Sequence, residues 1–285
     1  MTPATSRYAT LDGMRTHLLE AGVGGRPLLL LHSGEYGGCA ETSWQHVMAP
    51  LAQAGYHVVA PDWLGFGRTD KVVDFADPRG RRLRHIAAVI ESLGWAAPAI
   101  VGNSMGGTYL AQDLASDRPV LPASAAVLVS GGGFVPDNDA RRATLDYDLS
   151  REGMRRILAT VLYSPALSQD EDYLTWRHEL SLIPGAWQCT ASARLRPPGQ
   201  GVGGGEFGKP DDTRYERIGC PTLVVAGAQD PLRLPGYADE LAARIPDAEL
   251  LTYEDCGHMP NIEQPDRFVD DLLSFLDRRY ARRAA

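Results

Sequence analysis

The sequence predicts an α/β protein with a doubly wound, mostly parallel sheet and an inserted helical cap. Two observations carry this prediction. Short, mostly apolar runs alternate with helix-like stretches, and the alternation stops between about residues 134 and 214. Apolar runs without a polar face are typical of strands that helices bury on both faces. These runs span residues 28–31, 58–60, 99–101, 126–129, 223–226 and 249–253.

Local signals predict the other elements of the sheet and its helices. Asp12-Gly13 lies within residues 8–20 between two short runs, and this pair favours a tight hairpin, so the chain should open with an antiparallel edge. Phe268, Leu272 and Phe275 give the last helix an apolar face. The helices predicted between strands span residues 44–53, 81–93, 105–115 and 237–244.

The interruption of the pattern predicts the division of the chain. We assign residues 1–133 and 215–285 to the α/β core and residues 134–214 to a helical cap, or lid. Within the cap, periodicity predicts helices over residues 144–149, 151–162 and 171–182. The Gly- and Pro-rich residues 197–208 should form a mobile connector at its end. They lack the Lys-Ser/Thr pair of a phosphate-binding loop, so we expect no nucleotide.

Composition limits the partners of the protein. A chain of 285 residues with 44% hydrophobic and 22% charged residues is typical of a globular protein with one principal core. A net charge of -8 argues against nucleic acid, and no apolar stretch approaches the ~18 residues of a membrane span. The four cysteines and the histidines show no metal-ligand spacing. We expect a cytoplasmic protein that acts on a small-molecule substrate without metal or other cofactor; homo-oligomerisation stays open.

The first candidate for a catalytic motif is the segment Gly102-Asn103-Ser104-Met105-Gly106. It follows the apolar run of residues 99–101 directly and precedes a helix-like stretch. A sharp turn between strand and helix exposes a serine hydroxyl at the carboxyl edge of a sheet. Glycines are needed on either side because a side chain there would collide with neighbouring backbone. A purely structural glycine-rich turn would fit the same residues. Whether Ser104 is a nucleophile therefore depends on whether the chain supplies a histidine and a carboxylate as its partners.

Asp230 and His258 are these partners. Asp230 lies just past the run of residues 223–226 and His258 just past that of residues 249–253, so both should reach the edge that carries Ser104. A neutral hydroxyl is a weak nucleophile, and His258 would accept its proton while Asp230 orients the imidazole. The structural alternatives are a loop-capping carboxylate and a buried structural histidine. The three residues together predict attack on a carbonyl carbon, by Ser104 or by a water that His258 activates.

A second backbone donor is needed for the oxyanion that such an attack creates. His32-Ser33-Gly34-Glu35 follows the run of residues 28–31, in the place where this architecture supplies it. We predict that the N–H groups of Gly34 and Met105 form the oxyanion hole. An ordinary strand-ending turn is the alternative.

Four segments resemble a known family: LHSG at residues 31–34, APDWLGFGRTDK at 60–71, GNSMGG at 102–107 and CGH at 256–258. From about Gly13 to the last helix, the chain resembles the α/β-hydrolase family and, within it, the meta-cleavage product hydrolases. These enzymes cleave a carbon–carbon bond in dienol diketo acids from aromatic-ring degradation. The resemblance implies the α/β-hydrolase fold with a cap domain.

The resemblance also implies substrate-binding residues. Arg177, in Trp176-Arg177-His178, looks like the cap arginine that binds the anionic end of the substrate in this group, and its fork suits a carboxylate. A solvent-facing arginine is the alternative. Asn103 would help to position the substrate, and Ser33 and Met259 are further candidates for contact with it.

Three departures from the family pattern bear on the substrate. Met259 stands where these hydrolases usually carry tryptophan. Glu35-Tyr36 replaces a common Gly-Pro pair, with Glu41 and Thr42 as extra residues after it. The third departure is the glycine-rich end of the cap. We expect all three to touch the pocket or its entrance and to leave the triad intact.

The leading hypothesis is therefore hydrolysis of a carbon–carbon bond adjacent to a carbonyl. A carboxylesterase or lactonase that acts on small esters would use the same triad, and an acyltransferase would differ in using an alcohol in place of water. Haloalkane dehalogenase and epoxide hydrolase are disfavoured because those relatives need a carboxylate where Ser104 stands. A hypothesis of a different class is a non-catalytic ligand-binding module with this fold, which turnover would exclude.

Overall fold

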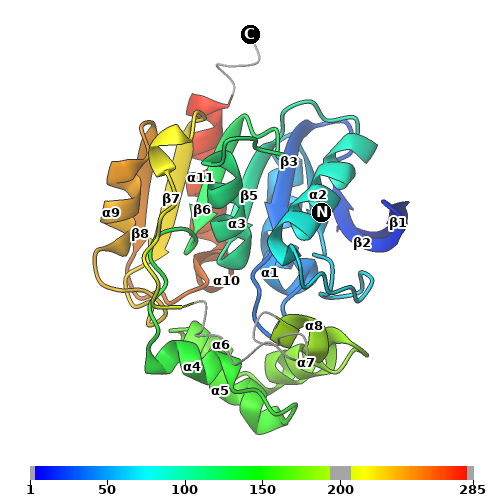
Figure 1. Cartoon of the computed structure of the whole chain (residues 1–285), viewed down its shortest axis with the longest axis vertical. Coiled ribbons are helices and arrows are strands. Elements are labelled where there is room, and N and C mark those ends of the chain that lie inside the picture. The colour runs from blue at the N-terminus through cyan, green and yellow to red at the C-terminus, as the bar shows by residue number, and fades with distance from the viewer. Residues whose placement is uncertain (1–3, 193–206, 281–285) are drawn as a thin grey trace.

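The computed structural model describes residues 4–192 and 207–280 and contains one eight-stranded sheet (Figure 1). The strand order is β1-β2-β4-β3-β5-β6-β7-β8. β1 pairs with β2 and β2 with β4 in antiparallel register, and every later neighbour is parallel, which confirms the predicted mostly parallel sheet with an antiparallel edge. The strands span Thr5–Leu11 (β1), Met14–Ala21 (β2), Arg26–Leu31 (β3), Tyr56–Pro61 (β4), Ala99–Asn103 (β5), Ala125–Val129 (β6), Thr222–Gly227 (β7) and Ala248–Tyr253 (β8).

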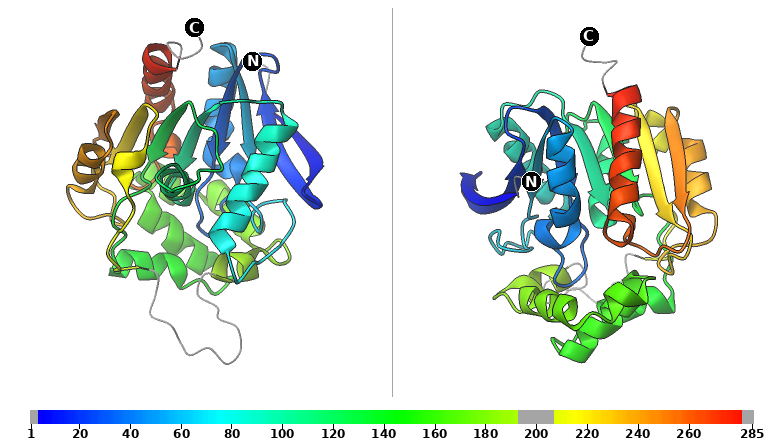
Figure 2. Two further views of the ribbon diagram at one scale, coloured as in Figure 1. Left: turned by 45° about the horizontal axis from the view of Figure 1, so that its top comes forward. Right: turned by 180° about the vertical axis from the view of Figure 1, so that it is seen from behind.

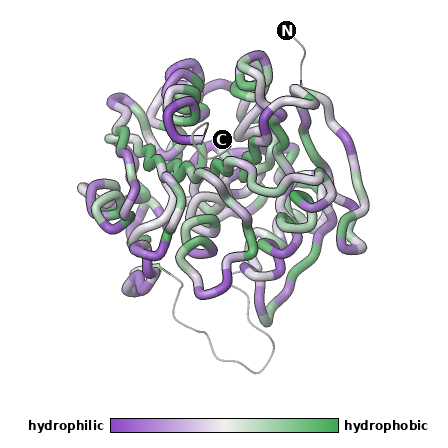
Figure 3. Tube along the Cα trace, turned by 90° about the horizontal axis from the view of Figure 1, so that it is seen from above, coloured by the Kyte–Doolittle hydropathy of each residue, from purple (hydrophilic) through white to green (hydrophobic). Residues whose placement is uncertain are grey.

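Helices cover both faces of the sheet, which explains why its central strands have no polar face. α1 (Ala40–Gln53) and α11 (Pro265–Arg279) lie side by side on one face (Figure 2, right) and share one apolar core with it. α2 (Pro78–Ser92), α3 (Met105–Leu114) and α9 (Tyr237–Arg244) enclose the second core on the other face. Figure 3 shows the hydrophobic residues gathered along the middle of the molecule between these helices.

Between β6 and β7 the chain leaves the sheet and forms a helical insertion beyond the carboxyl ends of the strands (Figure 1). Its helices pack on a separate apolar cluster that includes Tyr36 of the core. A 3-10 turn at Tyr215–Arg217 precedes β7, and α10 (Pro260–Glu263) precedes α11. The helices of the insertion are α4 (Asp139–Leu145), α5 (Arg151–Val161), α6 (Pro165–Ser168), α7 (Glu171–Ser181) and α8 (Ala186–Ala191).

Two of the three helices predicted in the cap are confirmed as α5 and α7, and the third is wrong in position. A helix was expected over residues 144–149, but α4 begins at Asp139, where the Asn138 side chain caps it by accepting the Arg141 N–H. Leu149 has a φ of 65°, which ends any helix before it. Most of the connector predicted at residues 197–208 lies outside the described residues.

Candidate active site

Ser104 lies in the sharp turn between β5 and α3 with a φ of 51° and a ψ of -110°. A non-glycine residue keeps such a conformation only where its surroundings enforce it. The glycines of the motif provide those surroundings. A Cβ on Gly102 would lie 2.5 Å from the carbonyl of Gly106, and a Cβ on Gly106 would lie 2.5 Å from the Leu31 oxygen. The backbone therefore packs around Ser104 more closely than any side chain would allow.

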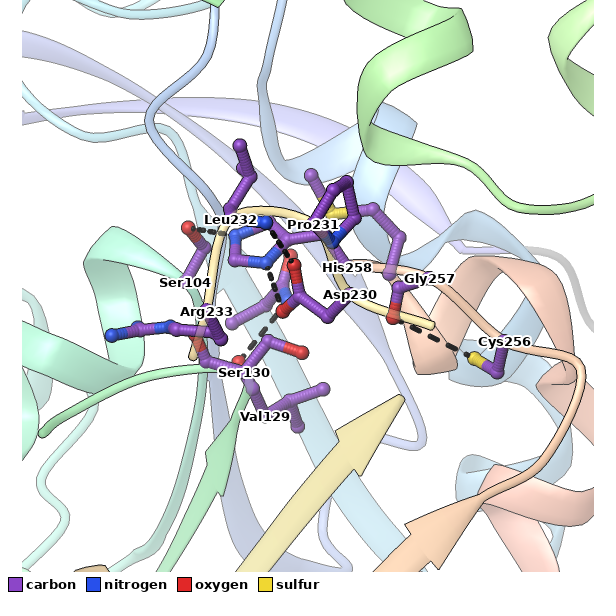
Figure 4. Close-up of polar contacts among 12 residues, drawn as sticks. Ser104, Val129, Ser130, Asp230, Pro231, Leu232, Arg233, Cys256, Gly257 and His258 are labelled. Atoms are coloured by element: carbon purple, nitrogen blue, oxygen red, sulfur yellow. Dashed lines mark hydrogen bonds and ion pairs between the residues drawn. The ribbon is translucent and has the colours of Figure 1, made fainter. Parts of the chain in front are cut away.

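Three side chains from the ends of β5, β7 and β8 meet in one hydrogen-bonded row (Figure 4). Nε2 of His258 lies 2.7 Å from Oγ of Ser104, and Nδ1 of His258 lies 2.6 Å from Oδ2 of Asp230. The side chains of His258 and Asp230 are each 1% exposed. The structure thus brings the alcohol, the imidazole and the carboxylate together.

The surroundings of Asp230 favour its ionised form. Burial alone would raise the pKa of Asp230, but the His258 ring and its hydrogen bond, together with Arg233, outweigh burial and lower the pKa. The Leu232 N–H also donates to Oδ1 of Asp230 at 2.9 Å. An ionised Asp230 accepts from Nδ1–H of His258, and this tautomer leaves Nε2 able to accept the Ser104 proton.

Glu263 holds the loop that carries His258, a role that sequence motifs did not reveal. Its Oε1 accepts from the Gly257 N–H at 2.8 Å, and its Oε2 accepts from the Tyr163 N–H at 2.7 Å. The N–H of His258 itself donates to the Val161 carbonyl at 3.0 Å. The loop after β8 is thus fastened to the end of α5, so the cap and the histidine are positioned together.

Gly34 and Met105 lie against each other beside Ser104. A Cβ on Gly34 would lie 2.7 Å from Sδ of Met105, and both residues line the same cavity as Ser104. Within residues 4–192 and 207–280, neither backbone N–H has an acceptor. Two unpaired donors next to the hydroxyl are what an oxyanion hole needs.

A cavity of about 610 Å³ lies between the core and the cap, in front of Ser104 and His258. This volume is in the usual range for a small-molecule site. Apolar wall residues include Phe66, Val161 and Leu232. Its charged wall residues are Glu35, Asp77, Arg79, Arg82, Arg141, Lys209 and Arg233.

Arg177 is absent from the lining of this cavity because a carboxylate of the chain covers it. The residue is 0% exposed on α7, and its Nη2 donates to Oε1 of Glu35 at 2.8 Å. Nη1 donates to the Tyr173 hydroxyl at 3.0 Å. Burial alone would raise the pKa of Glu35, but the Arg177 guanidinium, the Ser33 hydroxyl and His32 together outweigh burial and lower the pKa. An ionised Glu35 therefore takes the place at Arg177 that the resemblance gave to the substrate.

The other predicted substrate-binding residues differ in their access to the cavity. Met259 lines it. Ser33 and Asn103 do not: the Ser33 hydroxyl is buried and lies 3.4 Å from a hydroxyl of α1, and Nδ2 of Asn103 donates to the Val129 carbonyl at 3.2 Å. Both side chains are therefore bonded to other parts of the chain and not open to the cavity.

Arg141 and Arg233 are cavity residues that belong to no motif and that sequence reasoning missed. Arg233 lies beside the catalytic row in Figure 4 and donates through Nη2 to the Ser130 carbonyl at 2.5 Å and through Nη1 to that of Gly132 at 2.8 Å. It thereby fixes the segment where the cap leaves β6. Arg141 approaches from α4 and donates to the Leu232 carbonyl at 3.1 Å.

Among the described residues, no three His, Cys, Asp or Glu side chains are grouped so that they could hold a metal ion. No helix there combines the length and the apolar character that crossing a membrane requires.

Comparison with known proteins defines the class. Residues 28–271 match the model of the alpha/beta hydrolase family. The chain therefore belongs to the α/β-hydrolase family, and the fold that the sequence predicted is confirmed.

Its relatives narrow the class. The chain is 32% identical to the 2-hydroxy-6-oxo-6-(2'-aminophenyl)hexa-2,4-dienoic acid hydrolase of Metapseudomonas resinovorans, over 96% of this chain and 91% of that protein. It is 30% identical to the 2-hydroxymuconate semialdehyde hydrolase of Pseudomonas sp. strain CF600, over 96% and 95%. A solved serine hydrolase involved in carbazole degradation is 30% identical, with a TM-score of 0.80 over 97% and 100% of the two chains. The protein is thus a hydrolase related to the meta-cleavage product hydrolases.

Proposed function

We propose that the protein is a serine hydrolase that cleaves the carbon–carbon bond adjacent to a carbonyl in a dienol diketo acid of the meta-cleavage product type. The observation that carries hydrolysis is the row of Ser104, His258 and Asp230, with contacts of 2.7 and 2.6 Å. The relationship to hydrolases that are named for dienoic acids and a muconate semialdehyde supports the substrate class. The small-molecule substrate would occupy the cavity in front of Ser104.

The proposed reaction has two halves. Oγ of Ser104 attacks the carbonyl carbon while Nε2 of His258 accepts the hydroxyl proton. The N–H groups of Gly34 and Met105 stabilise the oxyanion, and losing one such donor typically costs about 3 kcal/mol of transition-state stabilisation. The carbon–carbon bond breaks, the departing carbon takes the proton back from His258, and water then hydrolyses the acyl ester on Ser104. This sequence uses no cofactor.

A second candidate is a carboxylesterase or lactonase acting on small esters. The ion pair between Glu35 and Arg177 favours it, because this pair removes the arginine that the resemblance assigned to an anionic substrate. A neutral ester needs no such partner. Both candidates use the same three residues and differ in the bond cleaved and in the charge of the substrate.

The decisive experiment offers the purified protein a ring-fission dienol and a p-nitrophenyl ester side by side. Loss of the dienol absorbance with formation of a dienoic acid selects carbon–carbon hydrolysis, and ester cleavage alone selects the esterase. A ligand-binding module would turn over neither.

Ser104→Ala tests the nucleophile on whichever substrate reacts. We expect the rate to fall by about a thousandfold or more, to the level that binding and the oxyanion hole sustain. Ser274→Ala, at an exposed position of α11, is the matched control and should keep wild-type activity. A Ser104→Ala variant that keeps more than about a thousandth of the wild-type rate would contradict the assignment.

A further inference from the structure

Arg141 is a cavity arginine whose guanidinium has no counter-ion among the described residues. Among the described residues, its one hydrogen-bond acceptor is the Leu232 carbonyl, 3.1 Å from Nη2, and no carboxylate lies within ion-pairing distance. Its Nε–H is buried there without a partner. Removing such a donor from water without an acceptor is unfavourable, so a further acceptor at this site would be stabilising.

Electrostatics around Arg141 favour an anion as that acceptor. Burial lowers the pKa of Arg141 to about 10, and the positive charge of Arg233 adds to this effect against the opposing influence of Asp230. Arg141 is therefore still protonated at neutral pH. The Asp230 carboxylate is bonded to His258, and among the described residues no carboxylate is bonded to Arg141.

Other arginines near the cavity are bonded to acceptors of the chain. Nε and both Nη atoms of Arg233 donate to backbone carbonyls. Arg82 donates to the Leu64 carbonyl and to the Tyr109 hydroxyl. Arg177 is paired with a carboxylate of the chain itself. Of the four arginines among the described residues that line the cavity, Arg141 is the one with a buried donor that has no hydrogen-bond partner.

Its position suits a substrate contact. Arg141 and Ser104 line the same cavity. The Leu232 carbonyl that Arg141 contacts belongs to the loop whose N–H groups hold Asp230, and Figure 4 shows Leu232 next to the His258 ring. A ligand bound at Arg141 would therefore lie beside the catalytic row.

We propose that Arg141 binds the carboxylate of the substrate, and that Arg177 does not because Glu35 occupies it. A planar guanidinium carries several N–H donors, which suits the two oxygens of a carboxylate. The proposal rests on the proposed function, since it names the group that recognises the anionic end of an organic-acid substrate at the same site.

Binding of two matched probes tests the proposal without turnover. One probe is 6-oxo-6-phenylhexanoate, a saturated keto acid without a dienol leaving group, and the other is its primary amide. Calorimetry should show that the wild-type protein prefers the acid. Arg141→Gln should weaken acid binding by about ten- to a hundredfold and leave amide binding nearly unchanged, because a hydrogen bond to a charged group is being lost. Arg141→Lys, which keeps the charge without the fork, should lose about tenfold or less.

Controls separate Arg141 from its neighbours. Arg142→Gln changes the next arginine of α4, which is exposed and paired with Asp137 and Asp139, and should leave both affinities unchanged. Circular dichroism and thermal melting check that each variant folds. Glu35→Gln should leave the preference of the wild-type protein for the acid in place.

Several results would overturn the proposal. The first is that the wild-type protein binds the acid no more tightly than the amide. The second is that Arg141→Gln weakens binding of both probes equally. The third is that Arg82→Gln removes the preference for the acid while Arg141→Gln keeps it. Stronger acid binding in Glu35→Gln, together with an unaffected Arg141→Gln, would assign the carboxylate to Arg177. These experiments measure binding and not turnover. Arg141 can therefore prove not to bind the carboxylate although Ser104 is required for hydrolysis, and Arg141 can bind it although Ser104 is not required.

Discussion

At the scale of single residues, Asp230 has the most demanding position in the row. It is buried yet keeps a lowered pKa, because His258, Arg233 and the Leu232 N–H compensate its charge. A charged group in such a place is stable only while each partner is present. The same partners fix the direction in which it accepts from His258.

Asp230→Asn is expected to lower kcat by about ten-thousandfold, because an amide can donate to Nδ1 and so favour the wrong imidazole tautomer. Initial rates of ester or dienol hydrolysis at neutral pH measure the effect. Asp239→Asn, at an exposed position of α9, is the matched control. A loss smaller than about tenfold would show that groups other than Asp230 orient His258.

Residues differ in how far the sequence predicts their partners. Ser104, Asp230 and His258 could be placed together because each follows a strand, and the carboxyl ends of parallel strands share one edge. The pair of Glu35 and Arg177 could not, since the two lie 142 positions apart, one in a loop and one on a cap helix. No periodicity relates such positions, so only the packed structure shows that they meet.

At the scale of elements, the turn from β5 to α3 depends on backbone contact. Gly106 lies so close to β3 that a Cβ would meet both the Leu31 and His32 carbonyl oxygens, at 2.5 and 2.9 Å. Backbone atoms of a central strand cannot move aside without disturbing the sheet. The helix can approach the strand this closely only because Gly106 has no side chain. The position of Ser104 depends on this approach.

Gly106→Ala should lower the free energy of unfolding by roughly 2–4 kcal/mol and remove most activity, because α3 has to move away from β3. Chemical denaturation and kcat measure the two effects. Gly219→Ala is the matched control, since a Cβ there meets no atom within 4 Å and the φ is not positive. Normal stability and activity in Gly106→Ala would mean that the turn from β5 to α3 can accommodate a side chain for which the structure shows no room.

The elements themselves were predictable where their sequence signal was long or wholly apolar. β3 to β8 coincide with the apolar runs to within two residues at either end, and α9 matches its predicted bounds. α6 and α8 were not predicted, because helices of four and six residues contain too little of a helical period to recognise. Their helical form depends on packing within the cap.

At the scale of the whole molecule, stability depends on pH through buried groups such as His85. This residue of α2 is 0% exposed, and its Nε2 lies 2.8 Å from Oγ1 of Thr16 on β2. Burial, together with the positive charge of Arg81, lowers the pKa of His85 from 6.5 to about 4. The folded protein therefore holds the neutral ring, whereas the unfolded chain binds a proton once the pH falls below about 6.5.

The sign of the effect follows from proton binding. Between about pH 6.5 and pH 4 the unfolded state holds more protons at this site, so stability is complete above this window and is lost as the pH falls through it. The loss amounts to about 3 kcal/mol over the window.

His85→Gln should remove this contribution, so urea denaturation at pH 7.5 and at pH 4 should show a smaller loss of unfolding free energy than in the wild-type protein. His46→Gln, at an exposed position of α1, should keep the wild-type dependence. If His85→Gln loses as much stability on acidification as the wild-type protein, the site is not the origin of the acid sensitivity.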